Sequence, residues 1–564
     1  TTGARDVHDA SHTTIARAIA THYQQAGIRR CFGVIGSTNF EITRGLVDHG
    51  VEFVAARHET NAVVMAQAWT QATGEISVVS LHTGPGLTNG LTGIGEAAKS
   101  RTPMVVLVGD VARGAVESPF FMDQATVVQS VGAEAQRLHG PRTALQDAAR
   151  ALELARRERR TVVLSLPLDI QGMPEDQARP VAGRPLRDLP PLEPAAEDVE
   201  VLADLLAGAE RPVVLAGLGA VLADARDDLI ALADRSGALL ATTARAHGLF
   251  AGQPWSVGIS GGFSSPAASE LLQEADVVLG FGATYTKFTT RFGRMFAKAR
   301  HVVQIDADRA RVGWNPTVDQ SVVADARLTA RRVTEALEGR GVRATGFRTP
   351  DTADRMERGA NNRHAYEDGS TDHELDPRTL TKALDELLPM ERTVAIDGGH
   401  FSGWPVRHLR VPDVHGWVFV QSFQSIGLGL ATAIGASLAN PHRLTVVGVG
   451  DGGFLMSIPD LETAVRLDRS MLIIVYNDSA YAAEVHHFAP MGMDTDIVEF
   501  PEVDFAAMGR GFGTRGAVAR RVDDLDAVRD WVAEGAPGVF VLDARVTRDV
   551  VADWLAEALR VEQG

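Results

Sequence analysis

The chain of 564 residues contains a single cysteine, Cys31. One cysteine excludes an internal disulfide framework and any cysteine-rich metal site. Cys31 lies in the strand-like run RRCFGVIG, so we expect a buried, small hydrophobic residue and not a nucleophile. The chemistry of the protein must therefore come from other residue types.

Long hydrophobic runs and an excess of positive charge are missing as well. No run approaches the roughly 18 apolar residues of a membrane span, and the N-terminal TTGARDVHDASH has no apolar signal core. We therefore expect a cytoplasmic protein without membrane contact. The net charge of −17, from 55 basic and 72 acidic residues, argues against nucleic-acid binding. It leaves room for a small anionic ligand, which needs only a local cationic pocket.

Apolar strand-like runs alternate with amphipathic helical patterns along the whole chain, which is too long for one hydrophobic core. This alternation predicts the α/β class, with three doubly wound parallel-sheet domains. The predicted domains span residues 1–172, 197–340 and 376–564. Proline-rich or polar linkers are predicted at residues 173–196 and 341–375.

The predicted strands are short apolar runs rich in valine, leucine and isoleucine. In the first domain they are residues 31–36, 51–56, 76–82, 104–110 and 161–169. In the middle domain they are residues 212–219, 238–243, 277–282 and 301–306. In the third domain they are residues 393–399, 418–422, 444–452, 471–478 and 539–546.

The most specific pattern joins a glycine turn and an asparagine in the third domain. The run LTVVGVG ends at Asp451, and the next apolar run, MLIIVYN, ends at Asn477. Two parallel strands joined by a crossover helix would bring both side chains to one sheet edge, where their oxygens could hold a hard cation. Gly450, Gly452 and Gly453 would leave room for a diphosphate. A doubly wound fold with an ordinary glycine-rich turn is the alternative.

A GDG turn followed by asparagine at this spacing resembles the cofactor motif of thiamine-diphosphate-dependent enzymes. The resemblance implies thiamine diphosphate bound through Mg²⁺, with Asp451, Asn477 and the backbone of Ser479 as metal ligands. It also implies that the segments IDGGHFSG, QSFQSIG and DSAY contact the cofactor, with a bulky residue of the second segment supporting its V-shaped conformation. The cofactor-binding candidates in these segments are Gly399, His400, Phe401, Ser425, Ile426 and Tyr481.

Glu59 is the candidate for the carboxylate that activates the aminopyrimidine ring of such a cofactor. It follows the run VEFVAARH and opens an apolar helix, whose N-terminus stabilises a negative charge. The RHE segment resembles the acetolactate synthase family, in which this glutamate has that role; a simple acid at a helix start is the alternative. The segments FGVIGS and GPGLTN resemble the same family and add the cofactor-binding candidates Gly36, Gly84, Pro85 and Asn89.

Further resemblances supply candidate catalytic residues. His82 in SLHTGPG and Ser37 in IGSTN resemble the active-site histidine and serine of benzoylformate decarboxylase. Gln124 in FFMDQ resembles the glutamine that reaches the active site in acetolactate synthases. Glu484 resembles the glutamate that follows the metal-binding asparagine in 2-hydroxyacyl-CoA lyases, where it could do general acid–base work. For Glu484, solvation or capping of a helix is the alternative.

The resemblance implies a carbon–carbon lyase or carboligase, acetolactate-synthase-like, acting on a 2-oxo acid through a C2 carbanion and an enamine. The Gly-Met-Val and Gln-Trp pattern of true acetolactate synthases is missing after Asn477. The Arg-Phe-Asp-Asp stretch of their flavin domain is missing too, and these departures count against pyruvate self-condensation and bound FAD. One alternative is a 2-hydroxyacyl-CoA lyase with a CoA thioester substrate and an adenine-nucleotide site in the middle domain.

A non-catalytic family member that only binds the cofactor is a second alternative. Glu59 and the complete metal motif argue against it. The resemblance also implies active sites between subunits, in a homodimer or a homotetramer.

Overall fold

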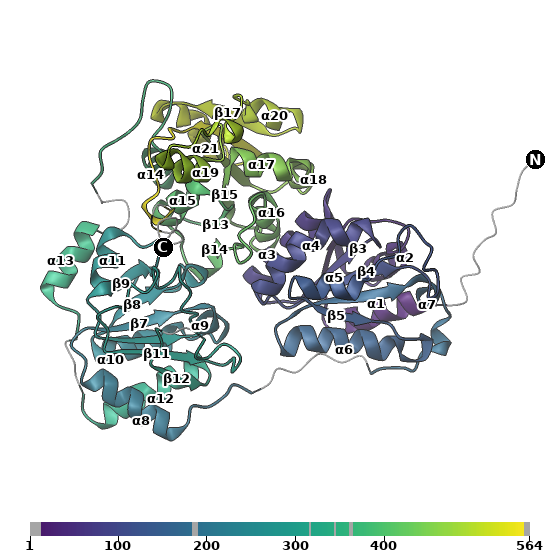
Figure 1. Ribbon diagram of the computed structural model, residues 1–564, viewed down its shortest axis with the longest axis horizontal. Coiled ribbons are helices and arrows are strands. Elements are labelled where there is room, and N and C mark those ends of the chain that lie inside the picture. Colours follow the sequence, from purple (N-terminus) through teal and green to yellow (C-terminus); the bar gives the residue numbers. More distant parts are fainter. Residues whose placement is uncertain are drawn as a thin grey trace, which may run out of the picture. The chain divides into compact units, whose positions relative to one another are not determined.

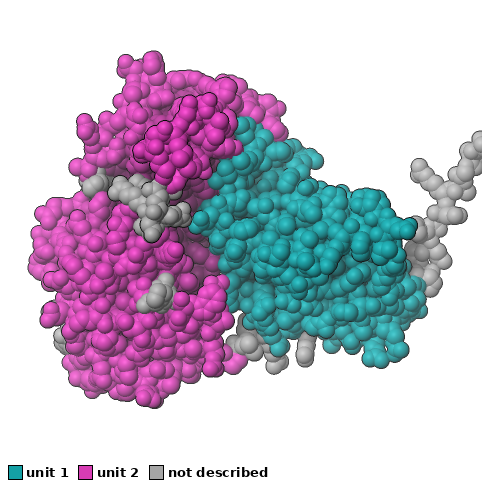
Figure 2. All heavy atoms as spheres, viewed as in Figure 1, with its two compact units in different colours: residues 1–189, 420–441, 453–469 teal, residues 190–419, 442–452, 470–564 magenta. Residues whose placement is uncertain are grey.

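Three parallel six-stranded sheets with flanking helices form the protein (Figure 1), which confirms the predicted fold class. The computed structural model describes residues 13–182, 190–314, 317–342, 346–359, 365–555 and 557. The other residues of the predicted domains and linkers lie outside the described residues. The chain divides into two compact units, coloured separately in Figure 2. Unit 1 comprises residues 1–189, 420–441 and 453–469, and unit 2 comprises residues 190–419, 442–452 and 470–564.

The first sheet lies in unit 1 and has the strand order β2-β1-β3-β4-β6-β5. Its strands are β1 (Arg30–Gly33), β2 (Glu52–Ala55), β3 (Ser77–Leu81), β4 (Met104–Asp110), β5 (Glu134–Arg137) and β6 (Thr161–Pro167). The core on one face, which includes the fully buried Cys31, is completed by α1 (Ile15–Gln25), α2 (Phe40–Asp48) and α6 (Ala144–Arg157). The other helices of this region are α3 (Glu59–Thr73), α4 (Pro85–Lys99), α5 (Gln124–Ser130) and α7 (Leu168–Gln171).

Helix α3 is enclosed on almost every side, which explains why its residues 61–70 are all buried. It packs against β3, α4 and α16 (Gly429–Ala439). Close approach of these helices depends on glycine. A Cβ on Gly93 of α4 would lie 2.8 Å from the carbonyl oxygen of Thr60, and one on Gly435 of α16 would lie 2.2 Å from that of Met65. These contacts fix the helix that begins at Glu59.

The middle sheet lies in unit 2 and has the order β12-β11-β10-β7-β8-β9. Its strands are β7 (Pro212–Ala216), β8 (Leu239–Thr242), β9 (Ser256–Ile259), β10 (Val277–Phe281), β11 (His301–Asp306) and β12 (Gln320–Val323). Alternate residues of β7 enter two separate core clusters, one with α8 (Ala196–Ala207), α10 (Arg226–Ser236) and α12 (Ala326–Gly339), the other with α11 (Pro266–Gln273). The remaining helices of this region are α9 (Leu218–Leu222) and α13 (Pro350–Gly359).

The third sheet, also in unit 2, has the order β14-β13-β15-β16-β18-β17. Its strands are β13 (Arg392–Ile396), β14 (Trp417–Val418), β15 (Leu444–Gly450), β16 (Met471–Asn477), β17 (Arg515–Ala519) and β18 (Val539–Arg545). The helices of this part of the chain are α14 (Pro377–Leu387), α15 (Gly403–His408), α17 (Asp451–Ser457), α18 (Leu461–Arg466), α19 (Ala482–Phe488), α20 (Phe505–Gly511) and α21 (Asp526–Ala533).

The first and third sheets share one strand order: second, first, third, fourth, sixth, fifth. In open α/β sheets, ligands bind outside the carboxyl ends of the strands at the point where the order reverses. That point lies between β1 and β3 in the first sheet and between β13 and β15 in the third. Gly36, Ser37 and His82 follow β1 and β3. Residues 399–401 follow β13, and Asp451 follows β15.

Some sequence-based predictions need correction. The sheets contain four strands that the sequence did not reveal, β5, β9, β12 and β17, and the predicted strand at residues 418–422 ends at Val418. Further along this segment, the backbone N–H of Ser422 donates to Glu96 at 2.9 Å and does not join the sheet. The second predicted linker contains helix α13. Within the described residues, no helix is long and apolar enough to cross a membrane.

Candidate active site

Asp451 and Asn477 leave the same edge of the third sheet. Their strands, β15 and β16, are paired in register with Gly450 opposite Tyr476. Asp451 begins α17 and is 8% exposed, while Asn477 ends β16 and is 3% exposed. The predicted juxtaposition of the two strand ends is therefore present in the structure.

The amide of Asn477 is oriented by its hydrogen bonds. Its Nδ2 donates to Oδ1 of Asp543 at 2.8 Å and to the carbonyl of Val503 at 3.3 Å. Its Oδ1 instead faces the turn that follows, where it accepts from the backbone N–H of Ser479 at 3.2 Å. Asp543 is fully buried in β18 and also accepts from Arg545 at 2.9 Å. The sequence analysis missed Asp543; a carboxylate within an otherwise apolar strand was its only signal.

Two carboxyl groups, those of Asp451 and Asp478, lie close together at this turn. Burial raises the pKa of Asp451 to about 6. Burial and the neighbouring Asp451 raise the pKa of Asp478 to about 8. Ser479 has a left-handed backbone conformation, with φ of 57°. Its carbonyl group therefore does not point in the direction that a regular helix or strand would impose. Carboxylate, amide and carbonyl oxygens are the donors that Mg²⁺ prefers, so the residues present fit this ion.

The glycines of the motif pack against aromatic rings. A Cβ on Gly450 would lie 3.1 Å from the ring of Phe401, which itself stacks on Tyr476 at 5.2 Å. A Cβ on Gly452 would lie 2.3 Å from the ring of Tyr481. A side chain at position 452 would therefore displace the Tyr481 ring, and one at position 450 would make a tight contact with Phe401. Any room that both glycines leave for a diphosphate comes only from their missing side chains. Gly453 belongs to unit 1.

His400 is a neutral acceptor in the interior of unit 2. Its Nε2 accepts from the backbone N–H of Ala552 at 3.1 Å, and its ring lies 4.4 Å from that of His486. Burial and His486 lower the pKa of His400 to about 3. The histidine therefore ties the glycine loop after β13 to the C-terminal segment. Glu484 is exposed on the short helix α19.

In unit 1, Glu59 is the first residue of α3 and is half-buried. Its Oε2 accepts from Nδ2 of Asn89 at 3.1 Å, and a Cβ on Gly86 would lie 3.6 Å from its Oε1. Gly84 has φ of 61° and ψ of −108°, a conformation suited to glycine, and Pro85 opens α4. The starts of α3 and α4 thus meet at the carboxylate, which brings Glu59 and Asn89 together.

His82 and Ser37 form a second pair at the reversal point of the first sheet. The Nδ1 of His82 lies 2.9 Å from the carbonyl of Thr83, so this nitrogen carries the proton of the neutral ring. The other nitrogen, Nε2, lies 3.4 Å from Oγ of Ser37 and can accept a hydrogen bond. The ring rests directly on Gly36, where a Cβ would lie 2.0 Å from its Cδ2. The imidazole therefore has a fixed position and a fixed tautomer.

Gln124 is engaged in the interior. Its Nε2 donates to the carbonyl of Gly109 at 2.9 Å, and its Oε1 accepts from Ser165 at 2.7 Å. A weaker bond of 3.4 Å reaches Thr83, the residue after His82. The side chain is 5% exposed. From this position it supports the strand ends beneath His82.

Two buried carboxylates that the sequence analysis missed position these groups. Asp460 accepts from the backbone N–H of Arg57 at 2.9 Å and from Asn61 at 2.7 Å, which anchors the start of α3. Glu96 accepts from the backbone N–H groups of Ser422 and Phe423. It thereby holds the segment that leads to Ser425 and Ile426, which are both half-buried. A lone acid among small apolar residues was the only sign of Glu96.

Comparison with known protein families identifies the whole arrangement. The family described as "Thiamine pyrophosphate enzyme, N-terminal TPP binding domain" matches residues 13–131. The corresponding central domain matches residues 199–333, and the C-terminal TPP binding domain matches residues 397–544. The chain is a thiamine pyrophosphate enzyme. Both regions described above, around Glu59 and around Asp451, fall in TPP binding domains, so the predicted family and the cofactor thiamine diphosphate are confirmed.

Curated relatives of this thiamine pyrophosphate enzyme match it over nearly its whole length. A sulfoacetaldehyde acetyltransferase from Rhodobacter capsulatus is 28% identical, over 97% of this chain and 96% of its own. A catabolic acetolactate synthase from Raoultella terrigena is 28% identical, over 91% of each chain. The structure of a thiamine diphosphate-dependent 4-hydroxybenzoylformate decarboxylase from Rhodococcus jostii superposes with a TM-score of 0.80 at 20% identity, covering 95% of this chain and 99% of that one. The last similarity shows the shared fold.

Proposed function

We propose that this thiamine-diphosphate-dependent lyase or carboligase acts on a free 2-oxo acid. The observation that carries the proposal is the His82–Ser37 pair. At the strand ends, the hydroxyl of Ser37 can donate to a small substrate carboxylate. The unprotonated Nε2 of His82 can take up the proton that the reaction transfers. Such a compact polar pair also suits a carbonyl next to a carboxylate.

Each residue then has a defined task. Thiamine diphosphate, when bound, supplies the carbon nucleophile and the electron sink. Glu59, whose carboxylate is oriented by Asn89, would hydrogen-bond the aminopyrimidine ring. Asp451, Asn477 and the carbonyl of Ser479 would hold Mg²⁺ against the diphosphate. His82 takes up and returns a proton at Nε2, while Ser37 orients the substrate carboxylate and Glu484 is available as a second acid or base.

The remaining site residues complete the cofactor environment. Asp478 would supply a further carboxyl group to the metal site, and Ile426 would support the bent cofactor. By resemblance to the family, the cofactor lies between the first domain of one subunit and the third domain of another. We therefore propose a cytoplasmic homodimer or homotetramer, with domain boundaries at residues 1–172, 197–340 and 376–564.

A 2-hydroxyacyl-CoA lyase is less well supported because of the middle sheet. Its strand order reverses between β7 and β10, where a nucleotide would be expected. At that point the N–H of Gly219 donates to the carbonyl of Gly282 at 3.0 Å. A Cβ on Gly217 would lie 2.2 Å from the same oxygen. The turn therefore has backbone, and not open space, where phosphates would bind, which also disfavours FAD at this point.

The test is a substrate panel on protein reconstituted with thiamine diphosphate and Mg²⁺, in which CO₂, aldehydes and acyl-CoA products are measured together. CO₂ release from a free 2-oxo acid is the expected result. Cleavage of a 2-hydroxyacyl-CoA without CO₂ would instead establish the lyase alternative. Glu59→Gln, which keeps the shape of the side chain, should abolish turnover while cofactor binding persists. Unchanged turnover would refute the role of Glu59, and no turnover on any substrate would favour a non-catalytic family member.

A further inference from the structure

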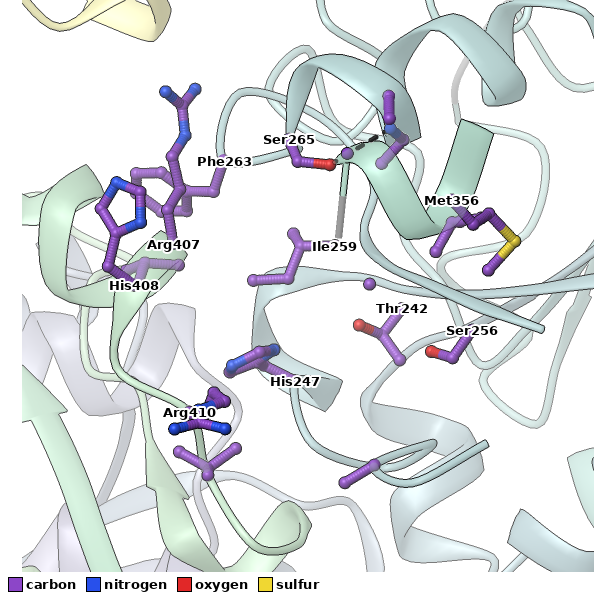
Figure 3. Close-up of a pocket in the computed structure, with 18 of the residues that line it drawn as sticks. Thr242, His247, Ser256, Ile259, Phe263, Ser265, Met356, Arg407, His408 and Arg410 are labelled. Carbon is purple, nitrogen blue, oxygen red and sulfur yellow. Dashed lines mark hydrogen bonds between the residues drawn. The ribbon is translucent and has the colours of Figure 1, made fainter. Parts of the chain in front are cut away.

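A cavity of about 920 Å³ opens within unit 2, beside the edge strand β9 of the middle sheet (Figure 3). Its volume lies in the range of small-molecule sites. None of the cofactor-site candidates lines it, and it is separate from the reversal point between β7 and β10. A ligand in this cavity would therefore occupy neither the cofactor position nor the usual nucleotide position of such a sheet.

The two sides of the cavity differ in chemistry. The middle domain contributes an apolar and aromatic wall that includes Phe250, Trp255, Ile259, Phe263 and Met356. Strand β9 pairs only with β8 among the described strands, so backbone groups along its outer edge are available to a ligand. This side suits a flat or branched apolar body.

The opposite side is cationic. The cationic groups of this side are Lys382 of α14, Arg407 of α15 and Arg410, and the neutral ring of His408 lies among them. Figure 3 shows Arg407, His408 and Arg410 on one side with Ile259 and Thr242 across from them. Burial, then Lys382, Arg407 and Arg378, lower the pKa of His408 to about 3. Burial and Arg378 lower the pKa of Lys382 as well. Burial is the larger cause of both shifts, and the neighbouring cations add to it.

Two ion pairs already neutralise part of the positive charge of this wall. Arg407 pairs with Asp553 at 2.6 Å, and Arg410 pairs with Asp385 at 2.6 Å. The Nζ of Lys382 lies 4.2 Å from the ring centroid of Tyr366. Arg410 is 49% exposed, so its guanidinium can reach a further anion.

Some polar side-chain atoms of the described cavity lining have no hydrogen-bond partner. Among the described residues, four that line the cavity each have a buried polar side-chain atom without a partner: Thr242 Oγ1, His247 Nε2, Trp404 Nε1 and Arg407 Nε. The indole and guanidinium nitrogens can only donate. Each of these four atoms has almost no accessible surface, so the exposed cationic groups of the lining, and not these atoms, decide which ligand is favoured.

We propose that this cavity binds a small organic anion with an aromatic or branched apolar body. Its carboxylate, sulfonate or phosphate meets the wall formed by Lys382, Arg407 and Arg410, and its apolar part lies against Trp255 and Met356. The site is independent of the substrate proposed above. It is joined to the cofactor loop by α15, which directly follows Gly399–Ser402 in the chain.

The test uses 8-anilinonaphthalene-1-sulfonate, a fluorescent sulfonate with an aromatic body, on full-length protein saturated with thiamine diphosphate and Mg²⁺. We expect saturable binding of one probe per chain. Lys382→Met should weaken it by about tenfold, as expected for loss of a charge-assisted contact. Lys298→Met, the same change at an exposed lysine that does not line the cavity, should leave binding unchanged. Met356→Trp, which fills the cavity from the opposite wall, tests the site without altering its charge.

Three results would overturn the proposal. The first is equal affinity of the Lys382→Met and Lys298→Met proteins for the probe. The second is equal binding of N-phenyl-1-naphthylamine, which lacks the sulfonate and would reveal a merely apolar surface. The third is undiminished binding by a folded Met356→Trp protein. Thermal melting of each variant identifies any that fails to fold, and the other variant then decides.

Discussion

The two ends of the Asn477 amide have different partners, and this difference determines which atom can bind a metal. Asp543 accepts from Nδ2, so Oδ1 is presented to the turn that contains Ser479. Asp451 and Asn477 could be predicted from sequence because each lies at the end of its own apolar run. Asp543 could not, because its importance depends on β18 lying next to β16, which only the sheet order reveals.

Asp543→Asn tests this orientation. The substituted amide can donate as well as accept, so it no longer fixes the amide of Asn477. We expect the apparent Mg²⁺ affinity during cofactor binding to fall by about tenfold, a typical effect of losing an outer partner of a metal ligand. The measurement is the quenching of tryptophan fluorescence by thiamine diphosphate across a Mg²⁺ titration. Glu386→Gln, an isosteric change at an exposed acid of α14, is the control, and equal behaviour of the two variants would contradict the assignment.

The raised pKa of Asp451 predicts a pH-dependent stability of the protein without cofactor. The folded state holds this proton more tightly than the unfolded chain does. The contribution of Asp451 to stability is therefore greatest below its unfolded pKa of about 4 and is lost as the pH rises through about 6. Asp451→Asn should raise the melting temperature of the cofactor-free protein at pH 8 and have little effect at pH 4.5.

Melting curves of the two proteins at both pH values, with and without Mg²⁺ and thiamine diphosphate, measure this effect. Stabilisation by the cofactor and metal should disappear in Asp451→Asn. A variant that is less stable than the parent at pH 8 in the absence of cofactor would show that the buried charge is already compensated.

At the scale of elements, the sequence revealed the interior strands and missed strands at the sheet edges. The missed strands β5, β9, β12 and β17 all lie at an edge. Their sequences, EAQR, SVGI, QSVV and RGAVA, lack the continuous apolar run of a strand buried on both sides. An edge strand has one neighbour instead of two, so its composition is less constrained. Helix α13 was missed in a similar way, because its sequence is strongly polar.

Gly93→Ala tests how α3 is held in place. The added methyl group would meet Thr60 and Val63 at less than 3 Å, so α3 and α4 must separate. Overpacking of this kind costs about 1–3 kcal/mol, and the free energy of unfolding should fall by that amount in a denaturant titration. Because α3 begins at Glu59, turnover should fall as well. Gly140→Ala, at a position with nothing within 4 Å, should change neither quantity.

At the scale of the whole molecule, the compact units do not follow the order of the sequence. Helix α16, almost entirely buried, belongs to unit 1 although it lies more than 200 residues beyond the first sheet. The core clusters of the middle sheet, by contrast, come almost entirely from residues 202–347. Composition and strand patterns cannot reveal that α16 belongs to the unit of the first sheet, because this depends on contacts between distant parts of the chain.

Separate fragments of the chain should therefore differ in their ability to fold. A fragment of residues 1–182 lacks α16 and should expose the apolar side of α3. We expect it to aggregate or to melt without a cooperative transition, as measured by circular dichroism. A fragment of residues 190–359 keeps nearly all of its own core and should unfold cooperatively. A stable, cooperatively folded fragment 1–182 would show that α16 is dispensable for unit 1.

The repeated strand order of the first and third sheets also bears on the ancestry of the chain. A six-stranded order with two reversals, present twice in one polypeptide, is the trace expected of gene duplication, and the middle sheet follows a different order. After duplication, each copy could lose functional residues that the other copy retained. One copy keeps a lone carboxylate at a helix start, Glu59, and the other keeps a carboxylate and an amide at adjacent strand ends, Asp451 and Asn477. Under the proposed function, the two sheets hold different parts of one cofactor, the first through Glu59 and the third through Asp451 and Asn477.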